Sequence, residues 1–193
     1  MTNNVNVRKA TFEDIEGILN LQHIYLYTNL PPEDRLKGFV TTPFTSLQVR
    51  QVINNNGLFV ALDKGKVVGY IFSGSWAYFS AWPIFPFMLS SLSGMTYQNI
   101  IIKDSNTFQY GPVCIDKAYR GVSLFQKLFE EMRIHLVEKF AVGLTFINKI
   151  NSHSYHAHTR KLGLEVISEF YFNGNTYYAL AFDTKRSVLD KAN

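Results

Sequence analysis

Residues 108–140 have the residue types and spacing of an anion-binding site. The apolar and aromatic run 108–115 is interrupted by Gly111-Pro112, which predicts a strand that bends or bulges before it ends. After a turn that contains Arg120-Gly121, apolar residues recur at helical spacing with charged residues between them, which predicts an amphipathic helix. A strand that enters a helix through such a turn leaves backbone N–H groups at the helix start, where the helix dipole favours negative charge. The segment therefore predicts a phosphate site, with a strand–turn–helix unit that binds no ligand as the alternative.

Side chains that could transfer protons or bind a metal lie in a second segment, after residue 150. They are Tyr155, His153, His156 and His158. The three histidines are unevenly spaced and have no cysteine nearby, so they are poor metal ligands and typical of a solvated helix face. The single cysteine, Cys114, has no base beside it in the sequence, and we expect it in the core rather than as a nucleophile.

Length and composition restrict the class of protein. The 193 residues contain no linker-like stretch, which predicts one domain over residues 1–186 and a tail at 187–193. The share of hydrophobic residues is 47%, but the sequence has no continuous run of roughly 18 uncharged, apolar residues that could span a bilayer. The net charge of +4 comes from scattered basic residues, which argues against nucleic acid and suits a polyanionic cofactor. Without a leader sequence or a disulfide pair, the chain is expected to be cytoplasmic.

Periodicity and turn residues predict an alternation of strands and helices. The predicted strands are 5–9, 58–62, 66–72, 108–115, 143–150, 166–172 and 176–182. The predicted helices are 12–25, 46–54, 124–140 and 151–163. Gly65 and Asn173-Gly174 predict two hairpins, Pro31-Pro32 is expected to stop the first helix, and residues 33–44 are expected to be irregular.

Residues 75–104 form an aromatic insertion before the central strand. It is too long for a simple turn, and we expect an extra helix or loop that buries its rings on the sheet. Alternatively, some of its rings line an acceptor pocket. A membrane-surface helix is disfavoured, because no Lys or Arg lies between Trp76 and Ile102.

The central turn resembles the GNAT acyltransferase superfamily, whose motif reads Gln or Arg, any, any, Gly, any, Gly or Ala. Arg120 fills the first position, whereas Ser123 and Phe125 stand at the two small-residue positions. The resemblance implies a mixed, mostly antiparallel, twisted α/β sheet of about seven strands with about four flanking helices. It also implies that the sheet is splayed between its fourth and fifth strands.

The same resemblance implies acetyl-coenzyme A as the cofactor. The pyrophosphate would be held by backbone amides of the turn, namely those of Arg120, Gly121, Val122, Ser123, Leu124 and Phe125. The pantetheine arm and the oxyanion would be held along the fourth strand by Val113, Cys114 and Ile115. A Cβ at Ser123, and still more the ring of Phe125, would limit how closely the cofactor lies.

A second point of resemblance lies after residue 150. The family often carries Asn, a small residue and then Tyr or His, followed by Lys-Leu-Gly-Phe, and this chain has Asn151 and Lys161-Leu162-Gly163. Counting from Asn151 puts His158 at the Tyr position, whereas counting back from Lys161 puts Thr159 there. By this resemblance Asn151 and Ser154 would contact the pantetheine arm, although helix capping explains Asn151 equally well.

Acyl transfer from a thioester to an amine needs a neutral nucleophile, a stabilised oxyanion and a proton for the thiolate. If the resemblance holds, Tyr155 and His158 are the candidates for the proton donor. The fourth strand offers no carboxylate base, so the amine proton would leave through a water held by Gln109 or Tyr110, or to a base elsewhere such as Asp104.

The expected protein is an N-acetyltransferase that acts by direct attack in a ternary complex. Its acceptor is expected to be a small-molecule or peptide amine. Nucleic acid, membrane and metal are not expected as partners, and a homodimer is possible. The alternative is a domain of the same fold that binds acyl-coenzyme A as a sensor without turnover. A third reading is an unrelated α/β domain that binds another phosphate, or a protein partner through residues 76–92.

Overall fold

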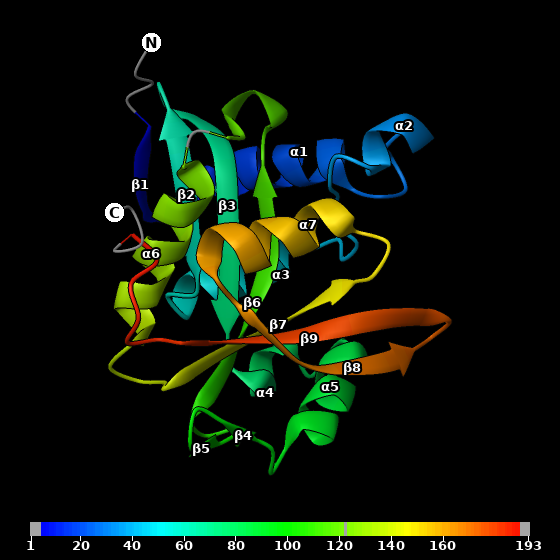
Figure 1. The fold of residues 1–193 in the computed structure, drawn as a ribbon. Helices are drawn as coiled ribbons and strands as arrows, with labels where there is room; N and C mark the ends of the chain where they lie inside the picture. The colour runs from blue at the N-terminus through cyan, green and yellow to red at the C-terminus, as the bar shows by residue number, and fades with distance from the viewer. Residues whose placement is uncertain (1–4, 122, 190–193) are drawn as a thin grey trace. The chain divides into compact units, whose positions relative to one another are not determined.

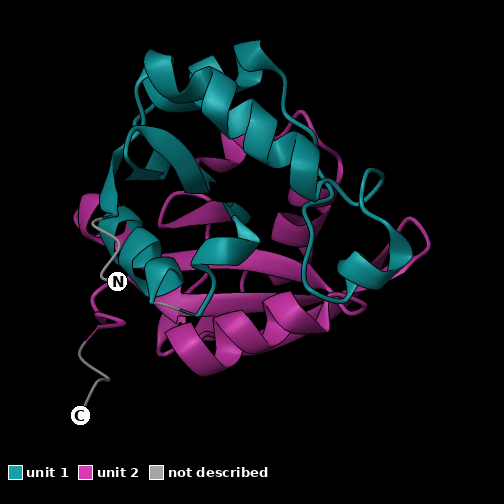
Figure 2. Ribbon diagram, turned by 90° about the horizontal axis from the view of Figure 1, so that it is seen from above, with its two compact units in different colours: residues 1–73, 111–132, 192 teal, residues 74–110, 133–191, 193 magenta. Residues whose placement is uncertain are grey.

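The computed structural model describes residues 5–121 and 123–189. It divides into two compact units, each built from separated stretches of chain (Figure 2). Among the described residues, unit 1 comprises 5–73, 111–121 and 123–132, and unit 2 comprises 74–110 and 133–189. The single domain stays a prediction. The predictions for Met1–Asn4 and for 190–193 lie outside the described residues, and Val188, in the predicted tail, is buried.

The strands of unit 1 follow the predicted hairpin closely. β1 (Asn6–Lys9) pairs antiparallel with β2 (Leu58–Asp63), which pairs antiparallel with β3 (Lys66–Gly74). The β2–β3 turn has Lys64 and Gly65 at φ values of 50° and 81°. Two consecutive left-handed residues match the right-handed twist of the two strands, so the turn closes the hairpin.

The helices of unit 1 confirm two predictions and correct one. α1 (Ile15–Tyr25) follows a short 3₁₀ turn, and α3 (Ser46–Asn54) has the predicted bounds, with a capping box in which Thr45 and Gln48 bond each other reciprocally. Residues 33–44 are not wholly irregular, because α2 (Pro32–Arg35) begins with Pro32 in the first turn, where a missing N–H costs nothing. Pro31-Pro32 therefore starts a helix, whereas α1 ends earlier, at Tyr25.

Unit 2 contains the second hairpin and the aromatic insertion. β7 (Val142–Asn148), β9 (Asn175–Asp183) and β8 (Glu165–Phe172) pair antiparallel in that order, and Asn173 and Gly174 are left-handed as the Asn-Gly signal requires. α7 (Ser152–His156) continues into a π-helix over Ala157–Leu162.

The aromatic insertion packs on the sheet. It forms α4 (Trp76–Phe79), α5 (Ile84–Leu92) and a small hairpin of β4 (Thr96–Tyr97) and β5 (Ile100–Ile101). The ring of Phe85 packs against those of Phe79 and of Phe146 in β7, with centroids 4.6 and 5.3 Å away. Trp76 Nε1 donates to Thr107 Oγ1 at 3.0 Å. The expected extra helix is therefore confirmed, and the rings of Trp76, Phe79 and Phe85 are buried, whereas that of Phe87 is 42% exposed.

The large sheet has the strand order β1-β2-β3-β6-β7-β9-β8 (Figure 1). β6 (Thr107–Ile115) pairs parallel with β7 through Thr107–Gln109, whereas the other described pairs are antiparallel. The predicted mixed, mostly antiparallel seven-stranded sheet is therefore confirmed. The described residues form seven α-helices instead of about four, because α2, α4 and α5 add to the predicted set. The splay stays a prediction.

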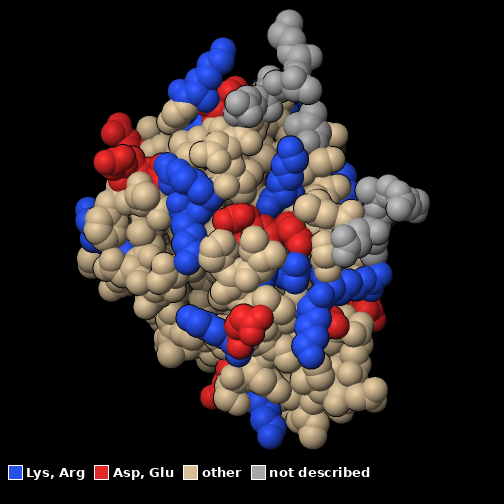
Figure 3. All heavy atoms as spheres, turned by 90° about the vertical axis from the view of Figure 1, so that its left-hand side faces the viewer, with Lys and Arg blue, Asp and Glu red and all other residues tan. Residues whose placement is uncertain are grey.

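The described helices are all too short or too polar to cross a bilayer. On the face drawn in Figure 3, Lys and Arg side chains alternate with Asp and Glu instead of gathering into one basic patch. This face therefore lacks the concentrated positive charge that nucleic-acid binding needs.

Candidate functional site

The turn between β6 and α6 (Leu124–Leu136) is held in place by contacts within unit 1. The 3₁₀ turn Lys117–Tyr119 is capped by Asp116, whose Oδ1 accepts from Ala118 N at 2.9 Å. Asp116 N donates to Val68 O at 2.9 Å, and Tyr119 Oη donates to Asp63 Oδ2 at 2.6 Å. These bonds fix the chain that leads from the end of β6 into α6.

Arg120 directs its charge towards the protein backbone. Its Nε donates to Ile115 O at 2.9 Å, its Nη1 donates to Lys37 O, and its guanidinium lies over the ring of Tyr25, 4.9 Å from the centroid. A guanidinium held by two carbonyls and an aromatic face has a fixed position. We therefore find Arg120 supporting the turn through its side chain.

The turn contains two residues with a left-handed backbone, and one of them stands at a glycine position of the motif. Gly121 has φ 88°, and Ser123, which stands where the motif has its first glycine, has φ 60°. Such a φ costs a residue with a Cβ about 1 kcal/mol. A left-handed backbone is thus present at the first glycine position of the motif although the glycine is not, and α6 begins at the next residue, Leu124. Val122 lies outside the described residues.

The bulky motif residue is placed in the protein interior. Leu124 and Phe125 are 3% and 9% exposed, whereas Gly121 and Ser123 are exposed. The ring of Phe125 is therefore removed from solvent. It leaves the exposed side of the turn, where Gly121 and Ser123 lie, open to a ligand.

β6 changes its environment halfway along. Its first four residues are buried, whereas Gly111–Val113 and Ile115 are partly exposed. Cys114 is buried, and burial raises the pKa of its thiol to about 12. The thiol is therefore neutral and the expected core cysteine is confirmed, so Cys114 can serve a ligand only through its backbone.

Asn151 caps α7 in unit 2. Its Oδ1 accepts from Ser154 N at 3.1 Å, and its backbone carbonyl accepts from Tyr155 N at 3.0 Å. The capping explanation of Asn151 is thus confirmed. The backbone N–H of Ser154 is used by this cap, so a ligand would meet Ser154 through its hydroxyl.

The one-residue mismatch between the two motif counts has a structural explanation. An α-helix bonds residue i to i+4, and a π-helix bonds i to i+5, so a π turn accommodates one extra residue. The π-helix Ala157–Leu162 lies between Asn151 and Gly163, which ends it with φ 71°. Asn151 at one end and Lys161-Leu162-Gly163 at the other can therefore both match the motif, with His158 in the π turn between them.

His158 is buried against Tyr110. Their rings stack with centroids 5.8 Å apart, and His158 Nδ1 lies 2.7 Å from Ser154 O. A carbonyl can only accept, so Nδ1 carries the proton and the neutral tautomer leaves Nε2 unprotonated. Burial lowers the pKa of His158 to about 4, so the imidazole is neutral near pH 7. A neutral imidazole of this tautomer is a poor proton donor for a departing thiolate.

Tyr155 has a more accessible hydroxyl. Its half-buried ring packs on Tyr178, with centroids 4.7 Å apart, and among the described residues its hydroxyl has no hydrogen-bond partner. It can therefore meet a ligand without first breaking a bond within the protein.

Gln109 carries a buried polar atom that needs a partner. Its Nε2 donates to Tyr110 O at 2.6 Å, and its side chain is 1% exposed. Its Oε1 has no hydrogen-bond partner within the described part of the chain. Because burying an amide oxygen without a partner costs about 1–3 kcal/mol, a water or a ligand is expected there. Asp104, the alternative base, is exposed.

The structure brings the sequence-predicted residues together in two groups. Unit 1 joins Val113, Cys114 and Ile115 to the turn, and unit 2 joins Gln109, Ser154 and His158 around Tyr110. Their union in one site stays a prediction. Sequence reasoning missed the contact of Tyr25, whose hydroxyl accepts from Lys117 N at 2.7 Å, because the two residues are 92 positions apart.

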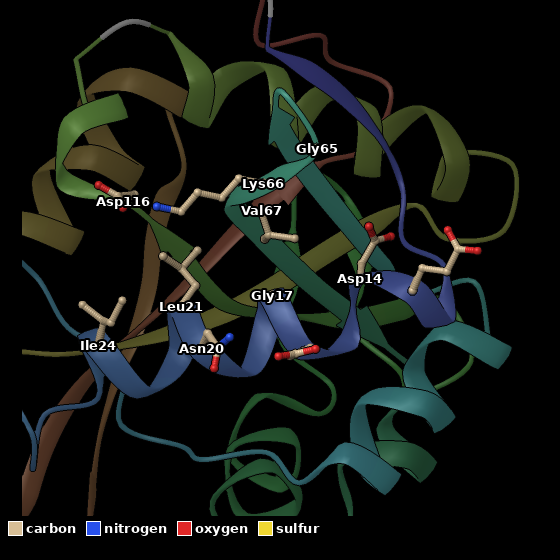
Figure 4. A pocket seen from close by; sticks show the side chains of 11 residues that line it. Asp14, Gly17, Asn20, Leu21, Ile24, Gly65, Lys66, Val67 and Asp116 are labelled. Atoms are coloured by element: carbon tan, nitrogen blue, oxygen red, sulfur yellow. The ribbon is translucent and has the colours of Figure 1, made fainter.

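A cavity of about 290 Å³ lies elsewhere in unit 1, between α1 and the start of β3 (Figure 4). Lys66 extends across it towards Asp116, and the buried carboxylate of Asp14 is held by Arg8 at 2.7 and 3.0 Å. The predicted site residues are absent from its lining.

No protein-family model matches the chain, and no curated protein matches it. Its structure is similar to solved structures of acetyltransferases. Ribosomal-protein-alanine N-acetyltransferase from Brucella melitensis is 16% identical, with a TM-score of 0.61 over 92% of this chain and 99% of that one. The acetyltransferase of the GNAT family from Streptococcus pneumoniae is 14% identical, with a TM-score of 0.60 over 93% and 99%.

A third similar structure, yncA from Salmonella typhimurium, was solved with its cofactor acetyl-CoA. It is 16% identical, with a TM-score of 0.63 over 95% of each chain. At such low identity a similarity over nearly the whole length establishes the fold and leaves the chemistry open. The chain therefore has the fold of the GNAT acetyltransferases.

Proposed function

We propose that the protein is an N-acetyltransferase that transfers an acetyl group from acetyl-coenzyme A to an amine by direct attack in a ternary complex. The observation that carries the proposal is the turn before α6, where Gly121 and Ser123 both have a left-handed φ. A turn of this shape at the start of a thirteen-residue helix presents backbone N–H groups to a pyrophosphate.

The residues of β6 and the turn suit the rest of such a cofactor. Val113 and Ile115 are partly exposed, so their backbone groups can bond the pantetheine amides and the carbonyl that becomes the oxyanion. When bound, acetyl-coenzyme A supplies the thioester acyl group. To Asn151 and Ser154, at the start of α7 in unit 2, we assign contacts with the pantetheine arm.

Two side chains have proposed roles in proton transfer. The amine attacks the thioester carbonyl, the C–N bond forms, the C–S bond breaks and the thiolate takes a proton. We assign that proton to Tyr155, because His158 is neutral with its proton engaged by Ser154 O. We assign to Gln109 Oε1, which is buried and has no hydrogen-bond partner among the described residues, the role of accepting from a water that removes the proton of the amine.

The acceptor is proposed to be a small-molecule or peptide amine. One structural neighbour is by its name a ribosomal-protein-alanine N-acetyltransferase, which favours testing peptides with free amino termini first. The cytoplasmic location stays a prediction.

Two measurements test the proposal. Calorimetry with coenzyme A should give saturable binding, and incubation with acetyl-coenzyme A and a panel of amines should release free thiol in an amine-dependent way. Saturable binding with no thiol release above the rate without amine would overturn the enzymatic assignment. Absence of binding would overturn the cofactor assignment as well.

A second candidate function, an acyl-coenzyme A sensor of the same fold, is favoured by one specific observation. β6 runs from Thr107 to Ile115 without a carboxylate that could act as the base for the amine. Its polar side chain Gln109 is a weaker base, and its amide nitrogen donates to Tyr110 O. Binding of coenzyme A without turnover is the result that this candidate predicts.

A further inference from the structure

Tyr25, the last residue of α1, contacts the turn before α6 in two ways. Its hydroxyl oxygen accepts a 2.7 Å hydrogen bond from Lys117 N, and its ring lies under the guanidinium of Arg120 at 4.9 Å. The side chain is 6% exposed, and burial raises the pKa of its hydroxyl. A buried, neutral phenol that satisfies a backbone N–H fixes the direction of that peptide group.

The segment 26–40 is attached to the backbone of Tyr25 and to the side chain of Arg120. Val40 N donates to Tyr25 O at 3.0 Å, and Tyr27 N donates to Val40 O at 2.9 Å. Arg120 donates to Ile115 O at the end of β6 and to Lys37 O within the segment. Tyr25 and Arg120, which contact each other, therefore both connect the turn to the segment. Tyr25 binds Lys117 N of the turn and Val40 N of the segment, and Arg120, itself in the turn, binds Lys37 O of the segment.

We infer that Tyr25 is a positioning residue for the proposed cofactor site and that it couples the turn at residues 116–121 to the segment 26–40. This inference rests on the proposed function, because the turn is the proposed pyrophosphate site. A ligand that holds the turn in one arrangement also holds the bonds to Tyr25 and Arg120, and through them the segment. Such coupling is reciprocal, so a change that loosens the segment lowers the affinity for the ligand by the same factor by which the ligand stabilises the segment.

The test compares wild type with Tyr25→Phe, using coenzyme A as the probe. The substitution keeps the ring under Arg120 and removes only the acceptor for Lys117 N. We expect coenzyme A to bind Tyr25→Phe about fivefold more weakly, a typical size for coupling between linked parts. In wild type, coenzyme A should slow hydrogen exchange of backbone amides in 26–40 as well as at the turn. In Tyr25→Phe the slowing at 26–40 should be weaker than in wild type, because only the link through Arg120 and Lys37 O remains.

A tyrosine two residues away provides a matched control. Tyr27 also lies against a guanidinium, that of Arg35 at 4.3 Å, and it belongs to the segment itself. Within residues 5–121 and 123–189, its side chain makes no hydrogen bond to the turn. Tyr27→Phe should keep both the affinity and the protection. A purely structural role of Tyr25 would lower the thermal stability and leave the protection pattern of the folded protein unchanged.

The outcomes separate this inference from the function on which it rests. If coenzyme A binds wild type but leaves exchange in 26–40 unchanged, or if Tyr25→Phe shows the same protection as wild type, the coupling is wrong and the cofactor assignment stands. If coenzyme A does not bind wild type at all, the cofactor assignment is wrong and the coupling with it.

Discussion

The imidazole of His158 stacks on the phenol ring of Tyr110, with ring centroids 5.8 Å apart and 28° between the ring planes. His158 is 6% exposed, and this burial lowers its pKa to about 4, whereas the unfolded chain has an ordinary histidine with a pKa near 6.5. Between these two values the unfolded state binds a proton that the folded state excludes.

Stability should therefore fall as the pH falls from 6.5 to 4, by about 3 kcal/mol at the lower limit. Denaturant unfolding at several pH values measures this. His158→Phe should flatten the curve in that window, whereas the same substitution at exposed His156 should not. Parallel curves for wild type and His158→Phe would show that another group controls this pH range.

Ser123 has a conformation that glycine adopts without strain. Ser123→Gly should raise the free energy of unfolding by up to about 1 kcal/mol and keep the affinity for coenzyme A. Ser123→Val should lower it, because a β-branched residue is strongly disfavoured at φ 60°. Equal stabilities of the glycine and valine variants would contradict this backbone conformation.

The thiol of Cys114 should be unreactive in the native protein. It is buried and its pKa is about 12, so almost no thiolate is present at pH 8. A thiol-specific chromogenic reagent should modify less than a tenth of the chains within an hour, and one thiol per chain after denaturant is added. Rapid native modification at an unchanged circular dichroism spectrum would mean that this part of β6 opens locally.

Tyr155→Phe tests the proposed proton donor. Since the hydroxyl has no partner among the described residues, its loss should leave thermal stability and coenzyme A affinity unchanged. The turnover number in the thiol-release assay should fall about 10²-fold, the usual size of a general acid contribution. Tyr171→Phe, at a residue that is 67% exposed, is the control. A Tyr155→Phe enzyme with wild-type turnover would remove Tyr155 from the chemistry.

Local features of the sequence were sufficient for most of the secondary structure. The turns at Gly65 and Asn173-Gly174 and the capped bounds of α3 depend on residues within a few positions of one another, and they formed as predicted. The prediction that Pro31-Pro32 stops the first helix was wrong. A proline ring that would stop one helix is also suited to the first turn of the next, and Pro32 begins α2.

By itself, the sequence determined the order of strands and helices, the amphipathic face of α6 and the Arg-Gly turn that precedes it. These follow from periodicity and from the φ preferences of single residues, which act over a few positions. Only the tertiary structure decided that Arg120 turns to backbone carbonyls, that Tyr25 anchors a peptide 92 positions away and that a π turn buries His158. The physical reason is that a pKa, a tautomer or the partner of a hydroxyl is set by neighbours in space, and these come together only when distant parts of the chain pack.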